Sequence, residues 1–401
     1  MTYDVAAVRK HFPALDEGAA HFDGPGGSQV PRQVGDAVAA TLTSAIANRG
    51  AVTSAERRAD GVVTGARQAV ADLLGADPGG VVFGRSMTQL TYDLARTMSA
   101  AWHPGDDVIV TRLDHDGNIR PWVSAAAAAG VAVQWAEFDG ETGELPVDAV
   151  TSLLGPRTRV VAVTGASNLL GTRPDLPAIA AAVHDAGALL AVDGVHLTPH
   201  APVDIAALGA DTFTCSPYKF LGPHHGVLAA SPDLFASLHP DKLLPQTDDV
   251  PERFELGTLP YELLAGTTAA VDFIAGLVPG TGSRRERVLA SMTAVEEYEA
   301  TLLARLVDGL TAIEGVTRHG RPPVQTPTVL FSVRGHDGAA VHRALAERGV
   351  NTPAGSFYAL EASRWIGLGD AGAVRAGLAP YSDDRDVDRL LEGVAALPVA
   401  G

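Results

Sequence analysis

Apolar runs of strand length alternate with alanine-rich segments over roughly the first two-thirds of the chain. Five runs stand out: "DDVIVTRLD", "VAVQWAEFD", "TRVVAVTGAS", "GALLAVDGVH" and "ADTFTCS". Between them, apolar positions recur with helical period, as in residues 121–129 and 176–186. Continuously apolar strands separated by helices are typical of a parallel sheet that is buried on both faces. The pattern therefore predicts an α/β fold with a mostly parallel sheet.

The pattern changes after the segment "LVPGTGS". Ser283 is placed to cap a long, charge-rich helix that runs to about Ile313. Separate strand and helix patterns follow in "TPTVLFSV", "GAAVHRALAERG" and "AVRAGLAPY". We predict a large domain over residues 18–278 and a smaller C-terminal α+β domain over residues 279–401, with an N-terminal arm, residues 1–17, that belongs to the smaller domain.

Composition and charge exclude several classes of partner. The 401 residues carry a formal net charge of −17 and no long run of lysine or arginine, so nucleic acid is not expected as a partner. No apolar stretch is long enough to span a bilayer, so no membrane partner is expected either. The single cysteine excludes an intrachain disulfide. The opening segment "MTYDVAAVRKHF" lacks the apolar core of a secretory signal. We predict a cytoplasmic protein.

Chemically active side chains follow the predicted strands. Ligands gather at the carboxyl ends of strands in open α/β sheets, because loops and helix N-termini converge there. Four strands end near such a side chain: His115, Asn168, Asp193 and Lys219. The segment "VVFGRSMTQL" adds Ser86 and Thr88 where a helix is expected to begin, and hydroxyls and free amide N–H groups at such a place can hold a phosphate.

This set matches the needs of one cofactor. Pyridoxal phosphate requires an amine to form an imine, an acid to keep the pyridine nitrogen protonated and a cradle for its phosphate. A metal ion fits less well. His196 and His200 are four residues apart, but Pro199 lies between them and breaks the helical geometry of many zinc pairs. We therefore predict pyridoxal phosphate and no metal.

Eight blocks in order carry a resemblance to a known family: "HFDGPGGSQVP", "NRGAVTSAE", "LDHDGNIRPW", "SNLLGT", "AVDGVHLTPHAPVDI", "CSPYKFLGPHHG", "RFELGT" and "VRAGLAPYSDDRDVDRL". Over nearly its whole length, the chain resembles the class V aminotransferase group of fold-type I pyridoxal phosphate enzymes, and within it the cysteine desulfurase-like branch. The resemblance implies a large domain with a mostly parallel sheet and a smaller C-terminal domain.

The resemblance also implies roles around the cofactor ring. Lys219 would form the Schiff base, Asp193 would pair with the pyridinium nitrogen, and His115 would stack on the ring. Asn168 and His196 would lie near the ring hydroxyl, at a position where the family often has glutamine in place of His196.

Further roles concern the phosphate, the partner subunit and the substrate. The phosphate would be held by Ser86, Met87, Thr88, Ser216 and Tyr218, the last where many relatives carry histidine. Thr258 would reach the phosphate from the neighbouring subunit, which implies a homodimer with shared active sites. Arg375 would pair with the carboxylate of an amino-acid substrate.

The sequence departs from the family in its sulfur chemistry. A cysteine desulfurase takes sulfur onto a cysteine of a mobile C-terminal loop, and the corresponding segment here, "NTPAGSFYALEASRWIGLGDAG", has none. Cys215 precedes Lys219 on a predicted strand, so we expect a buried thiol. The segments "NRGAVTSAE" and "GSFYALEASRW" are expected to line the substrate pocket.

Three functions remain open from the sequence. We favour a C–S β-lyase that acts on L-cysteine or a cysteine S-conjugate without a persulfide cysteine. The alternative is an aminotransferase or amino-acid epimerase, because the same lysine can move protons on and off Cα. A non-catalytic relative is disfavoured by the intact Lys219, Asp193 and His115, since a binding module needs no imine-forming amine.

Overall fold

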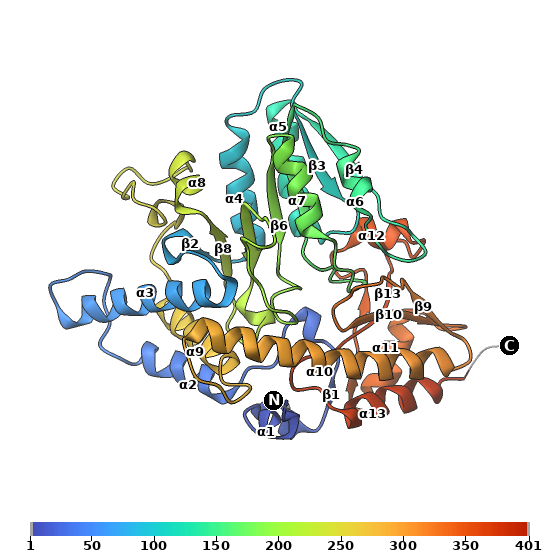
Figure 1. Ribbon diagram of the computed structural model, residues 1–401. Helices are drawn as coiled ribbons and strands as arrows, with labels where there is room; N and C mark the ends of the chain where they lie inside the picture. The colour runs from blue at the N-terminus through green and yellow to red at the C-terminus, as the bar shows by residue number, and fades with distance from the viewer. Residues whose placement is uncertain (1–2, 399–401) are drawn as a thin grey trace.

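A seven-stranded sheet forms the centre of the computed structural model, which describes residues 3–398 (Figure 1). Its strands run in the order β2-β8-β7-β6-β5-β3-β4. Their bounds are Val81–Gly84 (β2), Asp107–Thr111 (β3), Ala132–Ala136 (β4), Thr158–Thr164 (β5), Leu189–Asp193 (β6), Thr212–Cys215 (β7) and Gly226–Ala230 (β8). Only β8 runs antiparallel to its neighbours, β2 and β7. The predicted mostly parallel sheet is therefore confirmed.

Helices cover both faces of this sheet. The helices of the large unit are Arg32–Leu42 (α2), Ser54–Leu74 (α3), Met87–Ser99 (α4), Arg120–Ala129 (α5), Val147–Thr151 (α6), Leu176–Asp185 (α7), Pro232–Ser237 (α8) and Tyr261–Ile274 (α9). Residues of α3, α7 and α9 pack in one core, and residues of α4, α5 and α8 pack in the other. Along β5, Val161 and Val163 enter the first core, while Val160 and Ala162 enter the second. This alternation explains why β5 has a continuous apolar run over residues 160–163.

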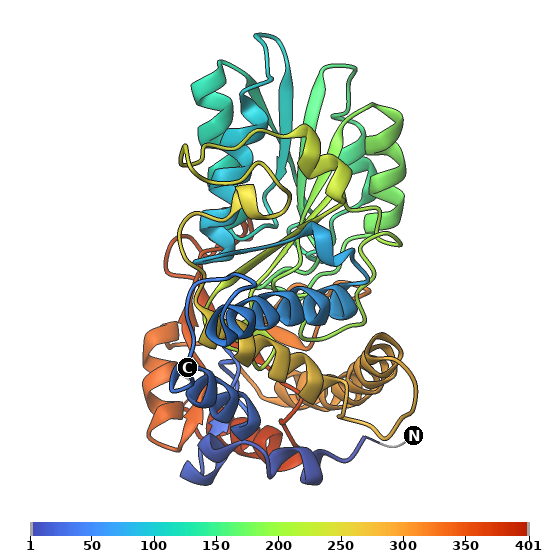
Figure 2. The same ribbon diagram turned by 90° about the vertical axis from the view of Figure 1, so that its left-hand side faces the viewer.

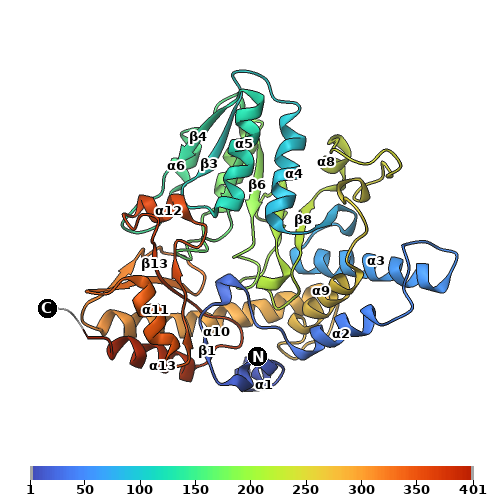
Figure 3. The same cartoon turned by 180° about the vertical axis from the view of Figure 1, so that it is seen from behind.

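The C-terminal part forms a second, smaller layer around an antiparallel sheet. That sheet has the order β12-β13-β10-β9, and β1 pairs with β11 beside it. The strands are Ala20–His21 (β1), Val316–His319 (β9), Thr328–Val333 (β10), Val350–Asn351 (β11), Ala354–Gly355 (β12) and Ala373–Gly377 (β13). The helices are Arg284–Ala312 (α10), Gly338–Ala346 (α11), Leu360–Trp365 (α12) and Asp384–Ala395 (α13). Seen from behind, these elements lie beside and below the central sheet (Figure 3).

The long helix α10 begins and ends where the sequence predicts. Ser283 caps it through a capping box with Glu286, in which each side chain bonds the backbone N–H of the other residue. Its first half packs against the large-unit core through Val288 and Val295, and its second half enters the small-unit core. The helix thus joins both cores (Figure 1), and the division at residues 278 and 279 stays a prediction.

The N-terminal arm also touches both parts. Its helix α1, Val5–Arg9, carries Arg9, which donates to Asp386 on α13 at 2.6 Å. Phe12 packs its ring against Tyr381 and against Phe273 of α9. The arm runs along the lower edge of the molecule (Figure 2). None of the helices within residues 3–398 is long and apolar enough to cross a membrane.

Candidate active site

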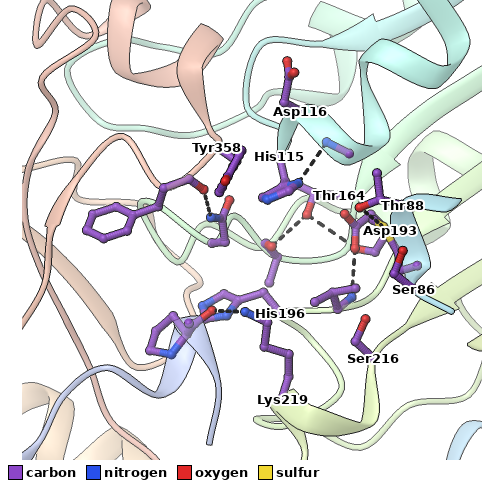
Figure 4. Close-up of a pocket in the computed structure, with 18 of the residues that line it drawn as sticks. Ser86, Thr88, His115, Asp116, Thr164, Asp193, His196, Ser216, Lys219 and Tyr358 are labelled. Atoms are coloured by element: carbon purple, nitrogen blue, oxygen red, sulfur yellow. Dashed lines mark hydrogen bonds between the residues drawn. The ribbon is translucent and has the colours of Figure 1, made fainter. Parts of the chain in front are cut away.

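A cavity of about 490 Å³ opens at the carboxyl ends of the parallel strands, where the two parts of the chain meet (Figure 4). Most of the predicted site residues line it: Ser86, Met87, Thr88, His115, Asn168, Asp193, His196, Ser216, Tyr218, Lys219 and Arg375. Thr258 is the exception. Residues that are 289 positions apart in the sequence are thus brought together around a single space.

Lys219 ends a 3₁₀ turn, Pro217–Lys219, directly after β7. Its Nζ donates to the carbonyl oxygen of Pro25 and lies 4.8 Å from the ring centroid of Tyr218. Burial lowers the pKa of Lys219 to about 7; Arg375 acts in the same direction, while Asp193 opposes the shift. A large share of this amine is therefore neutral near pH 7, which is the form that attacks a carbonyl carbon.

Asp193 is the last residue of β6 and is buried. Its Oδ1 accepts from the backbone N–H of Val195 at 2.9 Å. Burial raises the pKa of Asp193 to about 7. The Val195 N–H and the charge of Lys219 act in the opposite direction, because both stabilise the ionised carboxylate. Within residues 3–398 no cationic side chain forms an ion pair with this carboxyl group. A cationic ring N–H placed here would stabilise its charged form.

His115 caps a short turn, Asp116–Asn118 (η4), and its Nδ1 accepts from the backbone N–H of Gly117 at 2.9 Å. The proton of the neutral ring is therefore on Nε2. Burial lowers the pKa of His115 to about 4, with Lys219 and Arg375 contributing. The imidazole is thus a neutral, flat ring at the cavity wall and is suited to stacking.

The turn that carries His115 is held by a buried carboxyl group that the sequence analysis missed. Asp114 accepts from Asn118 Nδ2 at 2.7 Å and from the hydroxyl of Thr111. Burial raises its pKa to about 7. Asp114 directly precedes His115 in a quoted block, but nothing in the local pattern indicates that its side chain points inward.

The N-terminus of α4 supplies an anion cradle. Ser86 caps this helix, and its Oγ accepts from the backbone N–H of Gln89 at 3.1 Å. The first N–H groups of any helix lack partners within the helix, so those of Met87 and Thr88 can bind an anion. The backbone of Gly226 packs directly against this helix start, and a side chain there would displace it, because a Cβ atom would lie 2.2 Å from the carbonyl carbon of Ser86. These donors fit a phosphate group.

Arg375 on β13 has the arrangement of a carboxylate binder. It is only 2% exposed, its guanidinium lies 3.8 Å from the ring centroid of Phe357, and one terminal nitrogen donates to the carbonyl oxygen of Asn168 at 2.9 Å. Its Nε has no hydrogen-bond partner among the described residues. Burial lowers its pKa to about 9, with Asp23 opposing. A buried guanidinium with a free donor calls for an anionic ligand.

Asn168 lines the cavity and also holds a turn of the small domain. Its Nδ2 donates to the carbonyl oxygen of Phe357 at 2.9 Å, which leaves Oδ1 buried and without a partner among residues 3–398. Tyr358, the residue after Phe357, is held as well, because its carbonyl oxygen accepts from the backbone N–H of Asp116 at 2.6 Å. Phe357 and Tyr358 have left-handed φ angles of 54° and 58°. No local sequence signal indicates this conformation, although the segment itself was expected near the substrate.

Other expectations have mixed outcomes. The segment "NRGAVTSAE", residues 48–56, contributes no residue to the lining of the cavity as the structure describes it. Thr258 lies in a second cavity of about 450 Å³, with Arg85 and His224 among its other lining residues. Its expected contact with the phosphate of a neighbouring subunit stays a prediction. The lining also includes residues that the sequence analysis did not single out: Pro25, Tyr92, Asp116, Arg120 and Thr164.

Cys215, His224 and His225 do not line the cavity that contains Lys219. Cys215 is fully buried on β7, as expected, and burial raises the pKa of its thiol well above the ordinary value. His224 stacks on Tyr218, and His225 pairs with Thr267. Over residues 3–398 the structure contains no group of three or more metal-ligating side chains.

The fold and the site together define a class of protein. A buried lysine of lowered pKa, a buried strand-end carboxyl group, a flat imidazole and an anion cradle at one sheet edge are the parts of a pyridoxal phosphate-dependent enzyme of fold type I. The chain belongs to the class V aminotransferase family, whose model, "Aminotransferase class-V", matches residues 20–390. Pyridoxal phosphate is the cofactor of this family.

Three comparisons sharpen this placement. The chain is 39% identical to the uncharacterized protein MT3887 of Mycobacterium tuberculosis, over 99% of this chain and 100% of that protein. It is 30% identical to a cysteine desulfurase of Klebsiella pneumoniae subsp. pneumoniae, over 98% of each. It is similar in structure to the cysteine desulfurase CsdA of Escherichia coli, with a TM-score of 0.85, 26% identity and 98% of each chain covered. The two cysteine desulfurases support the cysteine desulfurase-like branch.

Proposed function

We propose that the protein is a C–S β-lyase that cleaves L-cysteine or, preferably, a cysteine S-conjugate without an intermediate persulfide. One observation carries the proposal: the only cysteine of the chain, Cys215, is fully buried in the core of the sheet. The cavity is instead bordered on its small-domain side by Phe357 and Tyr358. Sulfur would therefore leave with the substrate's own substituent, as a free thiol.

The residues would divide the work as follows. Arg375 would hold the α-carboxylate, because within residues 3–398 its buried guanidinium has a free donor and no acidic partner in contact. Lys219 would take the proton from Cα, since its lowered pKa makes it a base near neutral pH. Pyridoxal phosphate, when bound, supplies an electron sink for the bonds at Cα. Asp193 would hold the ring-nitrogen proton, and His115 would stack on the ring.

The reaction is balanced without any further reactant except water. The Cα–H bond breaks to Lys219 and the Cβ–S bond breaks to the leaving sulfur, which takes up a proton. Hydrolysis of the remaining three-carbon unit gives pyruvate and ammonium. Thr258 and the exposed Leu256, which line the same second cavity, support a homodimer that shares its active sites. A reducing, cytoplasmic setting suits the free Cys215 thiol.

The test is a panel of L-cysteine and S-substituted cysteines given to the cofactor-loaded protein. We expect free thiol and pyruvate in equal amounts, and continued thiol release in Cys215→Ser and Cys215→Ala. Loss of thiol release in both folded, cofactor-loaded variants would overturn the persulfide-free mechanism. Formation of an oxo acid without thiol would favour an aminotransferase, and inversion at Cα would favour an epimerase. Light scattering that finds an active monomer at micromolar concentration would contradict shared active sites.

A further inference from the structure

His196 lies at the junction between the large and small parts of the chain. Its side chain is buried and lines the same cavity as Lys219 (Figure 4). Its Nε2 is 3.0 Å from the hydroxyl oxygen of Thr328, which is the first residue of β10 in the small-domain sheet. Among the described residues, Nδ1 has no hydrogen-bond partner. The small domain therefore holds one ring nitrogen and leaves the other available to a ligand.

His196 has a single proton to place on two nitrogens. Burial lowers its pKa well below the ordinary value, and His200, Arg375 and Lys219 all act in the same direction. The ring is therefore neutral, with one nitrogen as a donor and the other as an acceptor. The partner of Nε2 decides which nitrogen carries the proton.

Thr328 is that partner. It is buried, and within residues 3–398 its hydroxyl bonds to no group other than His196 Nε2. If Nε2 carried the proton, the hydroxyl hydrogen of Thr328 would be left without an acceptor in a buried place, which is unfavourable. If Thr328 donates to Nε2 instead, both groups are satisfied and the proton of His196 is on Nδ1.

A second ring of the large unit, His200, packs against His196 and is itself held by a residue of α10. The ring of His200 packs edge-on against His196, with centroids 5.2 Å apart and planes at 72°. His200 Nδ1 is 2.9 Å from Glu299 Oε2, and Glu299 is buried on α10. The contact with Glu299 holds the His200 ring in place. Rotation of the His196 ring is therefore opposed from both sides.

We propose that Thr328 is a positioning residue: by donating to Nε2 it holds His196 in the tautomer that presents an Nδ1–H donor to the cofactor. The proposal rests on the proposed function, because the acceptor is an oxygen of pyridoxal phosphate. The ring hydroxyl of this cofactor is next to the carbon that a lysine amine attacks. A donor beside Lys219 would stabilise that oxygen in its negatively charged form.

The test is the visible absorbance of the pyridoxal phosphate-loaded protein as a function of pH. We expect Thr328→Val to raise the pH midpoint of the absorbance change by about 0.5 units or more, a change of about threefold in proton affinity. The sign follows because an oxygen that has lost its donor becomes more basic. Thr328→Ser should restore the wild-type midpoint, and His196→Phe should raise it at least as far as Thr328→Val.

A matched control is two residues away. Thr326 is also buried, but its hydroxyl donates to the carbonyl oxygen of Gly171 at 3.2 Å. Thr326→Val should leave the midpoint unchanged, which separates positioning from a general loss of packing. Thr328→Ala replaces Thr328→Val if the latter does not fold. A wild-type midpoint in the valine and alanine variants, or an equal shift in Thr326→Val, would overturn the proposal. Absence of any visible band in the loaded wild-type protein would instead contradict the proposed function.

Discussion

The floor and the roof of the cavity are built in different ways. The floor consists of Ser86, Asp193 and Lys219, which lie at the start of α4, at the end of β6 and in the 3₁₀ turn after β7. The roof is the turn that carries Phe357 and Tyr358, in which two successive residues adopt left-handed backbone angles. Such angles cost about 1–3 kcal/mol each and persist only where surrounding contacts hold them.

Those contacts come from the opposite domain. Beyond the turn itself, Glu361 on α12 pairs with Arg120 and Arg112 of the large unit, and Trp365 Nε1 donates to the carbonyl oxygen of Phe138 at 2.8 Å. The floor is therefore set by regular structure, whereas the roof depends on how the domains dock. We infer that the floor provides the shared chemistry and the roof selects the substrate.

The largest effect is expected on the floor. Lys219→Ala should lower kcat on the order of 10³-fold or more, because both the amine that captures the cofactor and the Cα base are lost. Turnover and the visible spectrum of the loaded protein measure this directly. Lys10→Ala, on an exposed part of the arm, is the matched lysine control and should behave as wild type. Undiminished turnover in Lys219→Ala would show that Lys219 neither captures the cofactor nor acts as the Cα base.

The second-largest effect is expected for Asp193→Asn, which should lower kcat by about 10²-fold at saturating cofactor. An amide oxygen in place of the buried carboxyl group can accept a hydrogen bond but has no negative charge to stabilise a cationic ring N–H, so the cofactor would be a weaker electron sink. Steady-state kinetics at several cofactor concentrations separate this effect from weaker binding. Wild-type kinetics in the saturated variant would show that the carboxyl group has no electronic role.

The pH dependence of cofactor capture tests the floor without any substrate. Burial lowers the pKa of Lys219 to about 7, so the neutral, reactive amine is depleted below that pH. The capture rate of the apoprotein should therefore fall about tenfold for each pH unit below 7 and level off above it. Arg375→Gln should move the midpoint upward, because a neighbouring positive charge is removed. A rate that does not change between pH 5 and 8 would contradict the lowered pKa.

The smallest effect is expected on the roof. Phe357→Leu removes the ring that lies against the Arg375 guanidinium, and we expect KM to rise about tenfold with an unchanged cofactor spectrum. Phe357→Tyr keeps the ring and should retain a KM near that of the wild type. If the leucine variant instead lost its cofactor band with little change in KM, the roof would belong to cofactor binding and the contrast with the floor would fail.

Much of the framework follows from local sequence signals. The apolar runs predict the strands β3 to β7, and Ser283 with Glu286 marks the start of α10 because a capping box involves residues only three apart. Asp193 and Lys219 could be placed at one edge of the sheet, since parallel strands all end on the same side. The family resemblance then supplied roles that spacing alone leaves open.

The rest was decided by tertiary packing. The roof turn has no local signature, because the left-handed angles of Phe357 and Tyr358 are held by Asn168 and Asp116 from another domain. Likewise, the partner of His196 is Thr328, 132 residues away on a separate sheet. A sequence pattern reports which face of its own helix or strand a side chain occupies. It does not report which distant side chain meets it, because that depends on how the two sheets and α10 dock together.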